Sequence, residues 1–418
     1  MKIARHIGVR PWMQGAAASV LALLDDGADT PQALFVGGCV RNALLDVDVG
    51  DVDIATAHEP DKTADILNRA GIKTVPTGIA HGTITALCAG RTFEITSLRA
   101  DIETFGRHAV VSYTKDWKVD AQRRDFTINT LLADAAGNVY DPLGQGLDDL
   151  DARRVVFVGD PARRIAEDYL RILRFFRFYG YYGQGAPDPA AIDACRAAAT
   201  QVRSLSRERI TQEWLKILAL SDAEAVLSLV FSCDILTDLP HGAYRPDILK
   251  ALAGIQETCD RIDCLMRLCV IAGMDSGHIP VLERYMVFSR ARTAHIRSLM
   301  AACRDLRGLS GKDYRLCAYH YGHDATLQAF LFKIVIQGDK AVDSCADYQA
   351  LAAHPPDIPV FPLNGRDLAA LGVPQGKDVG RILKNIEQWW IENDFNPGRD
   401  ACLTRAESLV QEGSGIQG

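Results

Sequence analysis

The sequence lacks the features that mark several classes of protein. Its eleven cysteines include no pair in the C-x-x-C spacing, which argues against a structural zinc site and against a disulfide framework. The scattered cysteines favour free thiols in a reducing cytoplasm. No stretch approaches the roughly 18 uninterrupted apolar residues of a membrane-spanning helix. The apolar run at 16–24 is short and precedes Asp25 and Asp26, so it predicts a helix and not a signal peptide.

The chain also lacks an excess of positive charge and an internal repeat. Its formal net charge is -7 at pH 7, which argues against a wholly basic nucleic-acid-binding protein but leaves room for a local basic surface. The composition is 48% hydrophobic and 24% charged, as in an ordinary globular protein. A length of 418 residues predicts about two to four domains.

Strand and helix signals divide the chain into two parts. Up to about residue 150, short strand-like runs alternate with helices and glycine turns, which predicts a small mixed sheet. Within this part, residues 1–30 are expected to form one helix and residues 99–118 a mobile polar loop. From the Asp-Pro pair at 160–161, successive helices are predicted, with a tail after the Pro-Pro pair at 355–356. The predicted fold class is therefore α+β, an α/β head followed by an all-helical remainder.

The first candidate site is residues 34–54, with the sequence LFVGGCVRNALLDVDVGDVDI. Asp51 and Asp53 alternate with apolar residues, so in a strand both carboxylates face one side and favour a divalent cation between them. The Gly-Gly turn lets backbone amides approach an anion, and Arg41 adds a charge suited to phosphate. These features predict a metal-dependent nucleotide site. A glycine turn beside a solvated acidic strand is the alternative.

Glu94 is the candidate for a third carboxylate at this site. It lies in the strand-like run TFEIT, whose apolar residues face away from it. Nucleotidyl transfer with two metals typically needs a carboxylate from a neighbouring strand beside such a pair. Asp101 and Glu103 compete for the role, and an exposed strand acid is the simpler interpretation of Glu94.

The run RRDFTIN, residues 123–129, is a candidate for binding a nucleoside triphosphate. It is expected within a helix over 120–132. Arg124 and the arginine before it match triphosphate oxygens, while Asp125 and Asn129 can reach ribose hydroxyls. A helix surface with an ordinary Arg–Asp pair is the alternative.

The run EDYLRILRFFRF, residues 167–178, is expected on one helix over 161–179. Asp168 and Arg171 are three residues apart, which would place an acceptor and a forked donor on one helix face. The two groups complement a base edge that carries an amino group beside ring acceptors, as in cytosine and adenine. Uracil and guanine would turn a carbonyl oxygen toward the carboxylate, so this pair would select C and A. An ordinary ion pair is the alternative.

The later arginines of the same run are expected to act less directly. Arg174 and Arg177 rotate away from that face, because a helix turns about 100° per residue, and would contact phosphate or brace the site. Residues 153–177 contain seven arginines against three acids. This segment is the local basic patch that the net charge conceals.

Two further patterns carry less weight. The run SRERITQE begins a helix with Ser206 as its N-cap. Arg207 and Arg209 would either extend the site or only pair with acids, and the structural role is favoured. The pair His323-Asp324 resembles part of a phosphohydrolase motif. It lacks a histidine at a suitable upstream spacing with a matching downstream aspartate, so that interpretation is not favoured.

In this order, the motifs resemble the class II tRNA nucleotidyltransferase and bacterial poly(A) polymerase family. The matching motifs are VGGCVRNALL…DVDI, RRDFTINTL, EDYLRILRFFRF and SRERITQE, with weaker likeness in DIETFGRHAVVSYTKDW and FPLNGRDLAALGVPQGKDVG. The resemblance is strong over 34–220 and weak over 220–355. One departure is Asn42, where the family usually has Asp after Arg. Asn keeps the shape but loses the charge that would brace Arg41.

The resemblance implies a division of the chain into four parts. These are a polymerase-β-like nucleotidyltransferase head (1–155), a helical neck with the base-selecting helix (156–220), a helical body (221–352) and a tRNA-binding helical tail (353–418). It implies Mg²⁺ at Asp51 and Asp53, and a role for the 99–118 loop in switching from C to A. The implied nucleotide contacts are Gly38, Arg41, Arg124, Asp168, Arg171, Arg174 and Arg177.

The expected activity is addition of C-C-A to the tRNA 3′ end from CTP and ATP, without a nucleic-acid template. The expected partners are therefore tRNA and the two nucleotides, with no membrane involved. A poly(A) polymerase, or an enzyme that adds only part of the triplet, remains an alternative. A tRNA-binding protein on an inactive scaffold is a more remote one.

Overall fold

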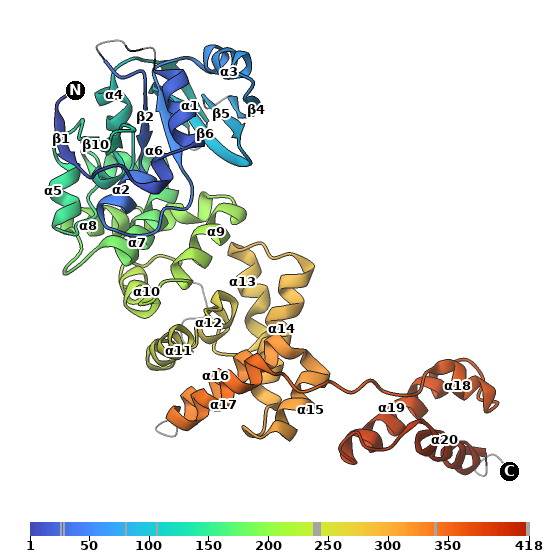
Figure 1. Cartoon of the computed structure of the whole chain (residues 1–418). Helices are drawn as coiled ribbons and strands as arrows, with labels where there is room; N and C mark the ends of the chain where they lie inside the picture. Colours follow the sequence, from blue (N-terminus) through green and yellow to red (C-terminus); the bar gives the residue numbers. More distant parts are fainter. Residues whose placement is uncertain are drawn as a thin grey trace. The chain divides into compact units, whose positions relative to one another are not determined.

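The computed structural model describes most of the chain. It covers residues 1–418 except 26, 28–29, 80–81, 106–107, 237–243, 338–340 and 415–418. For 101–105, 108–111, 341–345, 347 and 412–414 the backbone alone is described. The chain forms two compact units, unit 1 (1–239 and 281–287) and unit 2 (240–280 and 288–418). Figure 1 labels the elements of both.

Unit 1 is built on an eight-stranded mixed sheet in the order β1-β10-β9-β2-β3-β6-β5-β4. The strands are β1 (Ile3–His6), β2 (Ala33–Val36), β3 (Asp53–Thr56), β4 (Lys73–Gly78), β5 (Thr83–Cys88), β6 (Arg91–Ser97), β9 (Leu132–Ala133) and β10 (Asn138–Tyr140). β2 pairs antiparallel with β3, whereas β3 pairs parallel with β6. Every residue of the apolar strand β2 is buried, as its continuous hydrophobic sequence predicts.

Helices of unit 1 pack on this sheet and continue beyond it. They are α1 (Ala16–Leu24), α2 (Gly38–Leu44), α3 (Pro60–Arg69), α4 (Trp117–Gln122), α5 (Gly146–Asp151), α6 (Pro161–Glu167), α7 (Leu170–Tyr182), α8 (Pro189–Ala197), α9 (Arg207–Leu218) and α10 (Ala223–Ser232). α1 and α3 pack on each other and against β2, β4 and β5. Trp117 joins the buried cluster with Leu34 and Leu132, and its indole N–H donates to the carbonyl of Pro31 at 3.1 Å.

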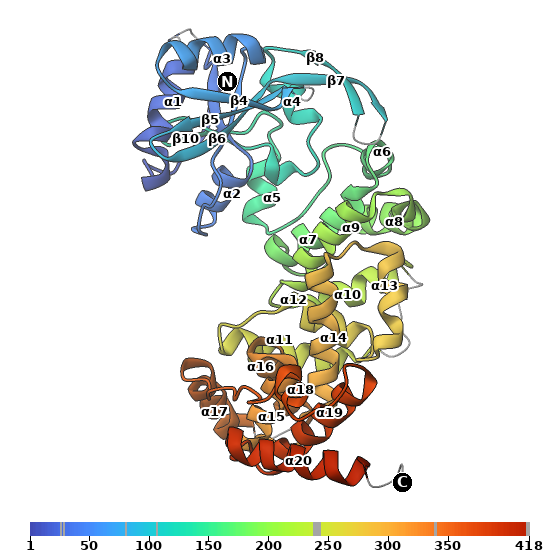
Figure 2. The ribbon, with the colours of Figure 1, turned by 90° about the vertical axis from the view of Figure 1, so that its right-hand side faces the viewer.

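Two predicted segments at the start of unit 1 are corrected. Residues 1–30 do not form one helix but β1, the 3₁₀ turn η1 (Pro11–Met13) and α1. Gly8 and Gly15, both at positive φ, and Pro11 interrupt the run. Residues 99–118 are not a loop: Figure 2 shows two paired strands, β7 (Arg99–Phe105) and β8 (His108–Tyr113), which form a sheet of their own.

The predicted helix over 120–132 is also wrong beyond its first turn. α4 ends at Gln122, and a 3₁₀ turn, η3 (Thr127–Asn129), precedes β9. The N–H of Thr127 donates to Val156 O at 3.0 Å, and the N–H of Val158 donates to Asp125 O at 2.9 Å. Because this backbone pairs with a segment about 30 residues away, it cannot continue the helical hydrogen-bond pattern.

Unit 2 is helical. Its helices are α11 (Pro246–Thr258), α12 (Cys264–Ile271), α14 (Arg290–Asp305), α15 (Gly311–Tyr321), α16 (His323–Gln337), α17 (Ala341–Ala353), α18 (Gly365–Ala370), α19 (Lys377–Glu392) and α20 (Arg399–Ser414); α13 (Ile279–Tyr285) includes the point where the chain re-enters unit 1. The sequence predicts helices in this part of the chain over 245–255, 260–272, 288–304, 324–336, 365–371, 378–391 and 399–412, and it misses α13, α15 and α17. Among the described residues no single helix is long and apolar enough to cross a membrane, although the bent pair Cys264–Ile271 and Ser276–Tyr285 passes on length and composition.

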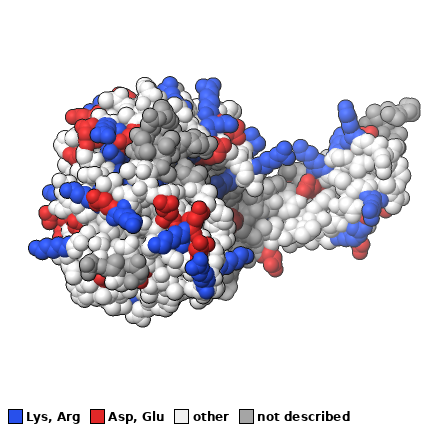
Figure 3. All heavy atoms as spheres, turned by 90° about the horizontal axis from the view of Figure 1, so that it is seen from above, with Lys and Arg blue, Asp and Glu red and all other residues white. Residues whose placement is uncertain are grey.

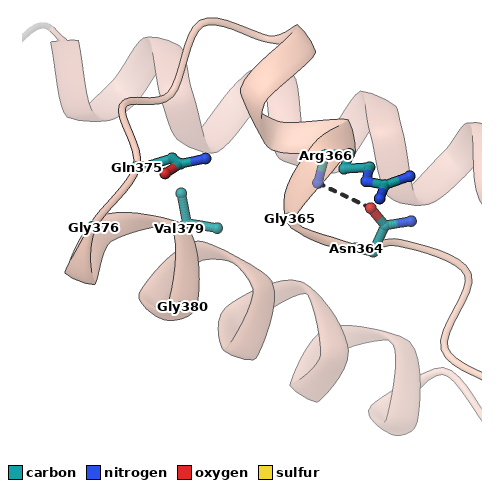
Figure 4. A pocket seen from close by; sticks show the side chains of 7 residues that line it. All are labelled: Asn364, Gly365, Arg366, Gln375, Gly376, Val379 and Gly380. Atoms are coloured by element: carbon teal, nitrogen blue, oxygen red, sulfur yellow. Dashed lines mark hydrogen bonds between the residues drawn. The ribbon is translucent and has the colours of Figure 1, made fainter.

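The last three helices enclose a small core of their own. Leu368, Ile386, Trp390 and Cys402 are buried there. Asn364 begins α18 with a capping box, in which its side-chain oxygen accepts from the N–H of Arg366 at 2.9 Å. A hollow of about 630 Å³ lies beside this turn, at the starts of α18 and α19. Figure 4 shows the residues around it. It is lined by Asn364, Gly365, Arg366, Gln375, Gly376, Val379 and Gly380.

Candidate active site

The acidic candidates gather at the start of β3. Asp53 is the first residue of this strand, Asp51 lies two residues before it, and both Val52 and Ile54 are buried as predicted. Glu94 pairs with Asp53 in the parallel β3–β6 ladder, so the two side chains lie on the same face of the sheet. The side chains of the competing Asp101 and Glu103 lie outside the described part of the structure.

Electrostatics make this acidic group a suitable place for a cation. Burial, which is the largest cause, and the negative charges of Glu94 and Asp51 together raise the pKa of Asp53 to about 6. The charge of Arg124 acts in the opposite direction. A divalent ion would relieve the repulsion, and carboxylate oxygens are the ligands that hard cations prefer.

The protein side chains alone form an incomplete cation site. Among the described residues, no group of three or more His, Cys, Asp and Glu side chains is arranged to hold a metal ion. An ion bound through one or two carboxylates, with substrate phosphates and waters completing the shell, is the usual arrangement for Mg²⁺. Asp51 and Asp53 fit that arrangement, with Glu94 as their neighbour.

The glycine turn between β2 and α2 brings Arg124 close to this strand. Gly37 has φ +71° and ψ −117°, a conformation that only glycine adopts without strain. A Cβ atom at Gly37 would lie 3.6 Å from Nη1 of Arg124. The N–H of Gly37 donates to Leu131 O at 3.1 Å, which fixes the turn against the segment that follows RRDFTIN.

Arg41 is buried and does not stand in an open phosphate site. The residue is 6% exposed, and its guanidinium donates to the side chains of Asn42, Asn129 and Tyr182, all neutral groups. It also stacks on the ring of Tyr182, 4.0 Å from the centroid. Burial lowers the pKa of Arg41. In this arrangement Arg41 joins elements of the site.

Asp120 orients both arginines of the RRDFTIN run. Arg123 lies 2.7 Å and Arg124 3.0 Å from its carboxylate. Burial would raise the pKa of Asp120, but the charges of the two arginines outweigh it and lower the pKa overall. The sequence analysis missed Asp120, although its i,i+4 spacing from Arg124 was a usable signal.

Asp125 and Asn129 form a buried polar pair that holds Arg174. The carboxylate of Asp125 accepts from Arg174 at 2.8 and 2.5 Å and from the amide of Asn129 at 2.9 Å. Burial would raise the pKa of Asp125, yet the charge of Arg174 and these hydrogen bonds lower it to about 2. These two residues therefore serve structure in this state, with the ribose contact still a prediction.

The predicted single helix over 161–179 is wrong. α6 ends at Glu167, Asp168 has an extended backbone (φ −157°, ψ 106°), and α7 begins at Leu170. The Asp168 carboxylate accepts from the N–H of Leu170 at 3.1 Å, because aspartate favours helix caps over helix interiors. The predicted cap at the start of α6 is confirmed: Asp160 accepts from the N–H of Arg163 at 2.7 Å.

The break separates the contacts of the two candidate base-reading residues. Asp168 binds Arg209 at 2.6 Å. Arg171 binds Glu167 at 2.6 Å and donates to the carbonyl of Arg123 at 3.2 Å. The i,i+3 argument therefore does not apply to them: the Arg171–Glu167 pair spans the break from α7 to α6, and Asp168, at the break itself, is oriented by Arg209 of α9.

Arg177 is held by an acid that the sequence analysis did not single out. Its Nε donates to Glu213 on α9 at 2.6 Å, and its guanidinium lies 4.5 Å from the centroid of the Phe178 ring. Arg174 lies over the same ring at 5.2 Å. The only signal for Glu213 was its place in SRERITQE, the motif that also supplies Arg209.

A cleft of about 670 Å³ separates α4 from α6. Its lining residues are Ala100, Lys118, Val119, Gln122, Arg123, Leu143, Gln145, Val158, Gly159, Asp160, Arg163, Arg164 and Glu167. On the face shown in Figure 3, by contrast, basic and acidic side chains are interspersed without a wide patch of one sign. The cleft gathers basic side chains from both sides of RRDFTIN.

Comparison with known proteins gives consistent matches along the chain. Residues 33–156 match the family described as the poly(A) polymerase head domain, and residues 186–244 match the probable RNA and SrmB-binding site of polymerase A. CCA tRNA nucleotidyltransferase 1, mitochondrial, of Danio rerio is 33% identical over 385 residues, which cover 88% of this chain and 86% of the relative. This chain belongs to the CCA tRNA nucleotidyltransferase family.

Other CCA tRNA nucleotidyltransferases agree with this assignment. The CCA-adding enzyme of Limosilactobacillus fermentum is 29% identical over 389 residues, covering 91% of this chain and 94% of the relative. The crystal structure of the Bacillus stearothermophilus CCA-adding enzyme in complex with CTP has a TM-score of 0.76 at 22% identity, covering 98% of this chain and 100% of that one. The predicted polymerase-β-like head with a helical remainder is confirmed. Nucleotidyltransferases of this kind depend on divalent metal ions.

Proposed function

We propose that this protein adds C-C-A to the 3′ end of tRNA from CTP and ATP, releasing pyrophosphate. The proposal rests on the acidic group of Asp51, Asp53 and Glu94 beside Arg124, in a chain of the CCA tRNA nucleotidyltransferase family. From Arg124, a continuous set of polar contacts leads through Asn129 and Asp125 to α7. Metal chemistry and base selection are thereby physically joined.

In this proposal the metal is Mg²⁺, held by Asp51 and Asp53. When bound, it would acidify the 3′-hydroxyl of the tRNA and stabilise charge at the α-phosphate. Glu94 keeps the acidic field strong from the neighbouring strand. Arg124, held against Gly37, faces the same acidic strand and is placed to neutralise the triphosphate.

The remaining site residues have two proposed roles. Some select the base, and the others, called braces here, hold the site residues in position. Asp168 and Arg171 select the base, each prepared by an ion pair. Gly38 lines the turn that approaches the nucleotide. The braces are Arg41, Asp125, Asn129, Arg174 and Arg177, whose contacts are mainly with one another and with Tyr182 and Glu213.

The cleft between α4 and α6 is the proposed path of the tRNA acceptor end. Lys118, Arg163 and Arg164 are cationic groups that suit a phosphate backbone, whereas the overall charge of the chain is negative. The proposed division is head 1–155, neck 156–220, body 221–352 and tail 353–418, with the tail binding tRNA. The β7–β8 hairpin is the proposed element for switching from C to A.

The cytoplasm is the proposed compartment. The ten cysteines whose state the structure describes are free thiols, which suits a reducing environment. Three relatives carry "mitochondrial" in their names, and the thiols suit that compartment equally. Fractionation of the native cells would decide between them.

The deciding experiment supplies purified protein with tRNA lacking its 3′ end, Mg²⁺ and nucleotides. Incorporation of CMP and AMP as exactly one triplet is expected, and a long A tail would instead identify a poly(A) polymerase. Asp53→Asn should lower the rate about 10³-fold or more, since several kcal/mol of charge stabilisation are lost. Asp61→Asn, an exposed change on α3, serves as the control. An unchanged rate in Asp53→Asn would refute the role of Asp53 as a metal ligand, and no incorporation by the wild-type protein would leave only the tRNA-binding alternative.

Base selection has its own test. Asp168→Asn replaces an acceptor-only group with an amide that can also donate to a carbonyl. UMP incorporation relative to CMP should therefore rise by about 10- to 100-fold. If the ratio stays at the wild-type value, Asp168 does not read the base.

A further inference from the structure

A closed circuit of hydrogen bonds begins and ends on α7. Arg174 on α7 binds Asp125, whose carboxylate accepts from the Asn129 amide. The Asn129 side-chain oxygen accepts from Arg41 on α2. Arg41 in turn donates to the hydroxyl of Tyr182, the last residue of α7, at 2.7 Å. The first half of α7, through Asp125 and Asn129, and its last residue, directly, are thus linked to the same buried arginine.

Tyr182 makes three contacts at once in this circuit. Its hydroxyl accepts from Arg41 and donates to the side-chain oxygen of Asn42 at 3.2 Å. Its ring stacks on the Arg41 guanidinium. Because the same Asn42 oxygen also accepts from Arg41 at 2.9 Å, the three side chains form a closed triangle. Each polar group of the triangle therefore holds the other two in place.

Asn42 connects these hydrogen bonds to the loop that precedes Asp51 and β3. The side-chain amide of Asn42 donates to the backbone carbonyl of Asp48 at 3.0 Å. The backbone carbonyl of Asn42 accepts from the backbone N–H of Val47 at 2.9 Å. Residues 47 and 48 lie in the segment that leads from α2 to Asp51. An aspartate at position 42 could not make the first of these bonds, because an ionised carboxylate has no donor.

These contacts give a reason for the neutral residue after Arg41. The family that the sequence resembles usually has Asp after this arginine, where this chain has Asn42. In the structure a hydroxyl and an aromatic face from Tyr182 support the buried cation, and Asn42 gains a donor for the loop. Cation–π stacking and a hydrogen bond to a charged group each stabilise a buried guanidinium.

We infer that Tyr182 and Asn42 are positioning residues. They fix the position of the base-selecting helix α7 relative to the segment that carries Asp51 and Asp53. Their own polar contacts are with Arg41, with each other and with the loop at 47–48. Their effect passes through Arg41 and the Asp48 carbonyl, so that the base held by α7 and the α-phosphate held at β3 meet in one geometry. This inference rests on the proposed nucleotidyl transfer.

The test compares Tyr182→Phe with Tyr181→Phe in the full-length chain. Tyr181 is adjacent, of the same type, and 50% exposed, so it provides a matched control. Tyr182→Phe keeps the ring but loses both hydroxyl hydrogen bonds. We expect kcat for CMP addition to fall about ten-fold, with KM for CTP changed by less than about two-fold. We also expect the ratio of CMP to UMP incorporation to fall about ten-fold.

The incorporation ratio separates positioning from simple loss of folded protein, because the fraction of active enzyme cancels in it. Asn42→Ala should lower kcat as well. In the double variant with Tyr182→Phe, the two losses should not multiply, since both residues act through one circuit.

Two results would overturn the inference. One is a Tyr182→Phe variant with the same ratio and kcat as Tyr181→Phe. The other is a double variant whose losses multiply. Absence of any incorporation by the wild-type protein would instead refute the proposed function, so the two failures can be told apart.

Discussion

Single residues at this site are defined by their partners more than by their type. Arg123 and Arg124 share Asp120, Arg171 binds Glu167, and Arg209 binds Asp168. Most of these pairs are partly or fully buried, where an ion pair is screened less than at the surface. Losing one partner would leave a charge uncompensated, which costs far more than losing an exposed pair. The site is therefore largely preorganised before a nucleotide arrives.

Asp125 provides a pH test of this preorganisation. Its folded pKa of about 2 lies below the usual value, so it stabilises the fold above about pH 4 and the stabilisation is lost as the pH falls toward 2. The shift corresponds to about 2 kcal/mol. Asp125→Asn should therefore lower the free energy of unfolding most above pH 5, with the difference from wild type shrinking below pH 4. Urea denaturation between pH 3 and pH 7 would measure this.

A surface pair supplies the comparison for that test. Asp151 pairs with Arg5 in solvent, so Asp151→Asn should change the urea midpoint little at any of these pH values. Equal pH dependence in the two variants would contradict the role given to the Asp125–Arg174 pair.

At the scale of elements, the entry turn of α2 determines where the arginines lie. Gly15 and Gly37 precede α1 and α2 with almost the same backbone, φ +62° and ψ −125° against φ +71° and ψ −117°. No atom stands within 4 Å of a Cβ built at Gly15, whereas one at Gly37 would contact Arg124. Both turns therefore have the same strained backbone conformation, but only the turn at Gly37 lies against Arg124.

This difference predicts a split between stability and activity. Gly15→Ala and Gly37→Ala should each destabilise the fold by about 1–3 kcal/mol, because both force an alanine into a strained conformation. Gly37→Ala alone should also lower kcat by about 10²-fold, since the turn that must relax its backbone strain contacts Arg124 and leads into α2. Thermal unfolding and single-turnover CMP addition would measure the two effects. Equal activity in both variants would contradict the role of this turn.

On the scale of the whole molecule, charge is arranged locally against the overall sign. The chain carries a formal charge of -7, yet the cleft between α4 and α6 is lined by Lys118, Arg123, Arg163 and Arg164. The negative net charge disfavours non-specific binding of nucleic acid, while the basic side chains of the cleft allow a phosphate backbone to bind there.

The salt dependence of tRNA binding tests this arrangement. A plot of log KM for tRNA against log salt concentration should rise linearly, by about 0.7–0.9 for each phosphate contact. Lys118→Gln should lower that slope by about 1, because one contact is removed. Lys62→Gln, at an exposed position on α3, should leave it unchanged. A slope equal to the wild type in Lys118→Gln would place the acceptor end elsewhere.

The sequence by itself determined the family, the class of chemistry and the candidate residues. The informative patterns are local: the alternation around Asp51 and Asp53, the glycine turn and the ordered motifs. Such patterns involve residues close together in the chain, so the sequence alone shows them. Burial of Val52 and Ile54 and the cap at Asp160 followed from the same local rules.

Only the tertiary structure decided which of those residues meet. The 99–113 hairpin and the end of α4 depend on backbone pairing between distant segments, which leaves little periodic signal. The break at Asp168 arises because its carboxylate binds Leu170 and Arg209, and Arg209 is 41 residues away. Arg41, predicted to face phosphate, is buried against Tyr182, 141 residues further along the chain. Hydrogen bonds over such separations form only when the chain has folded, so no local pattern records them.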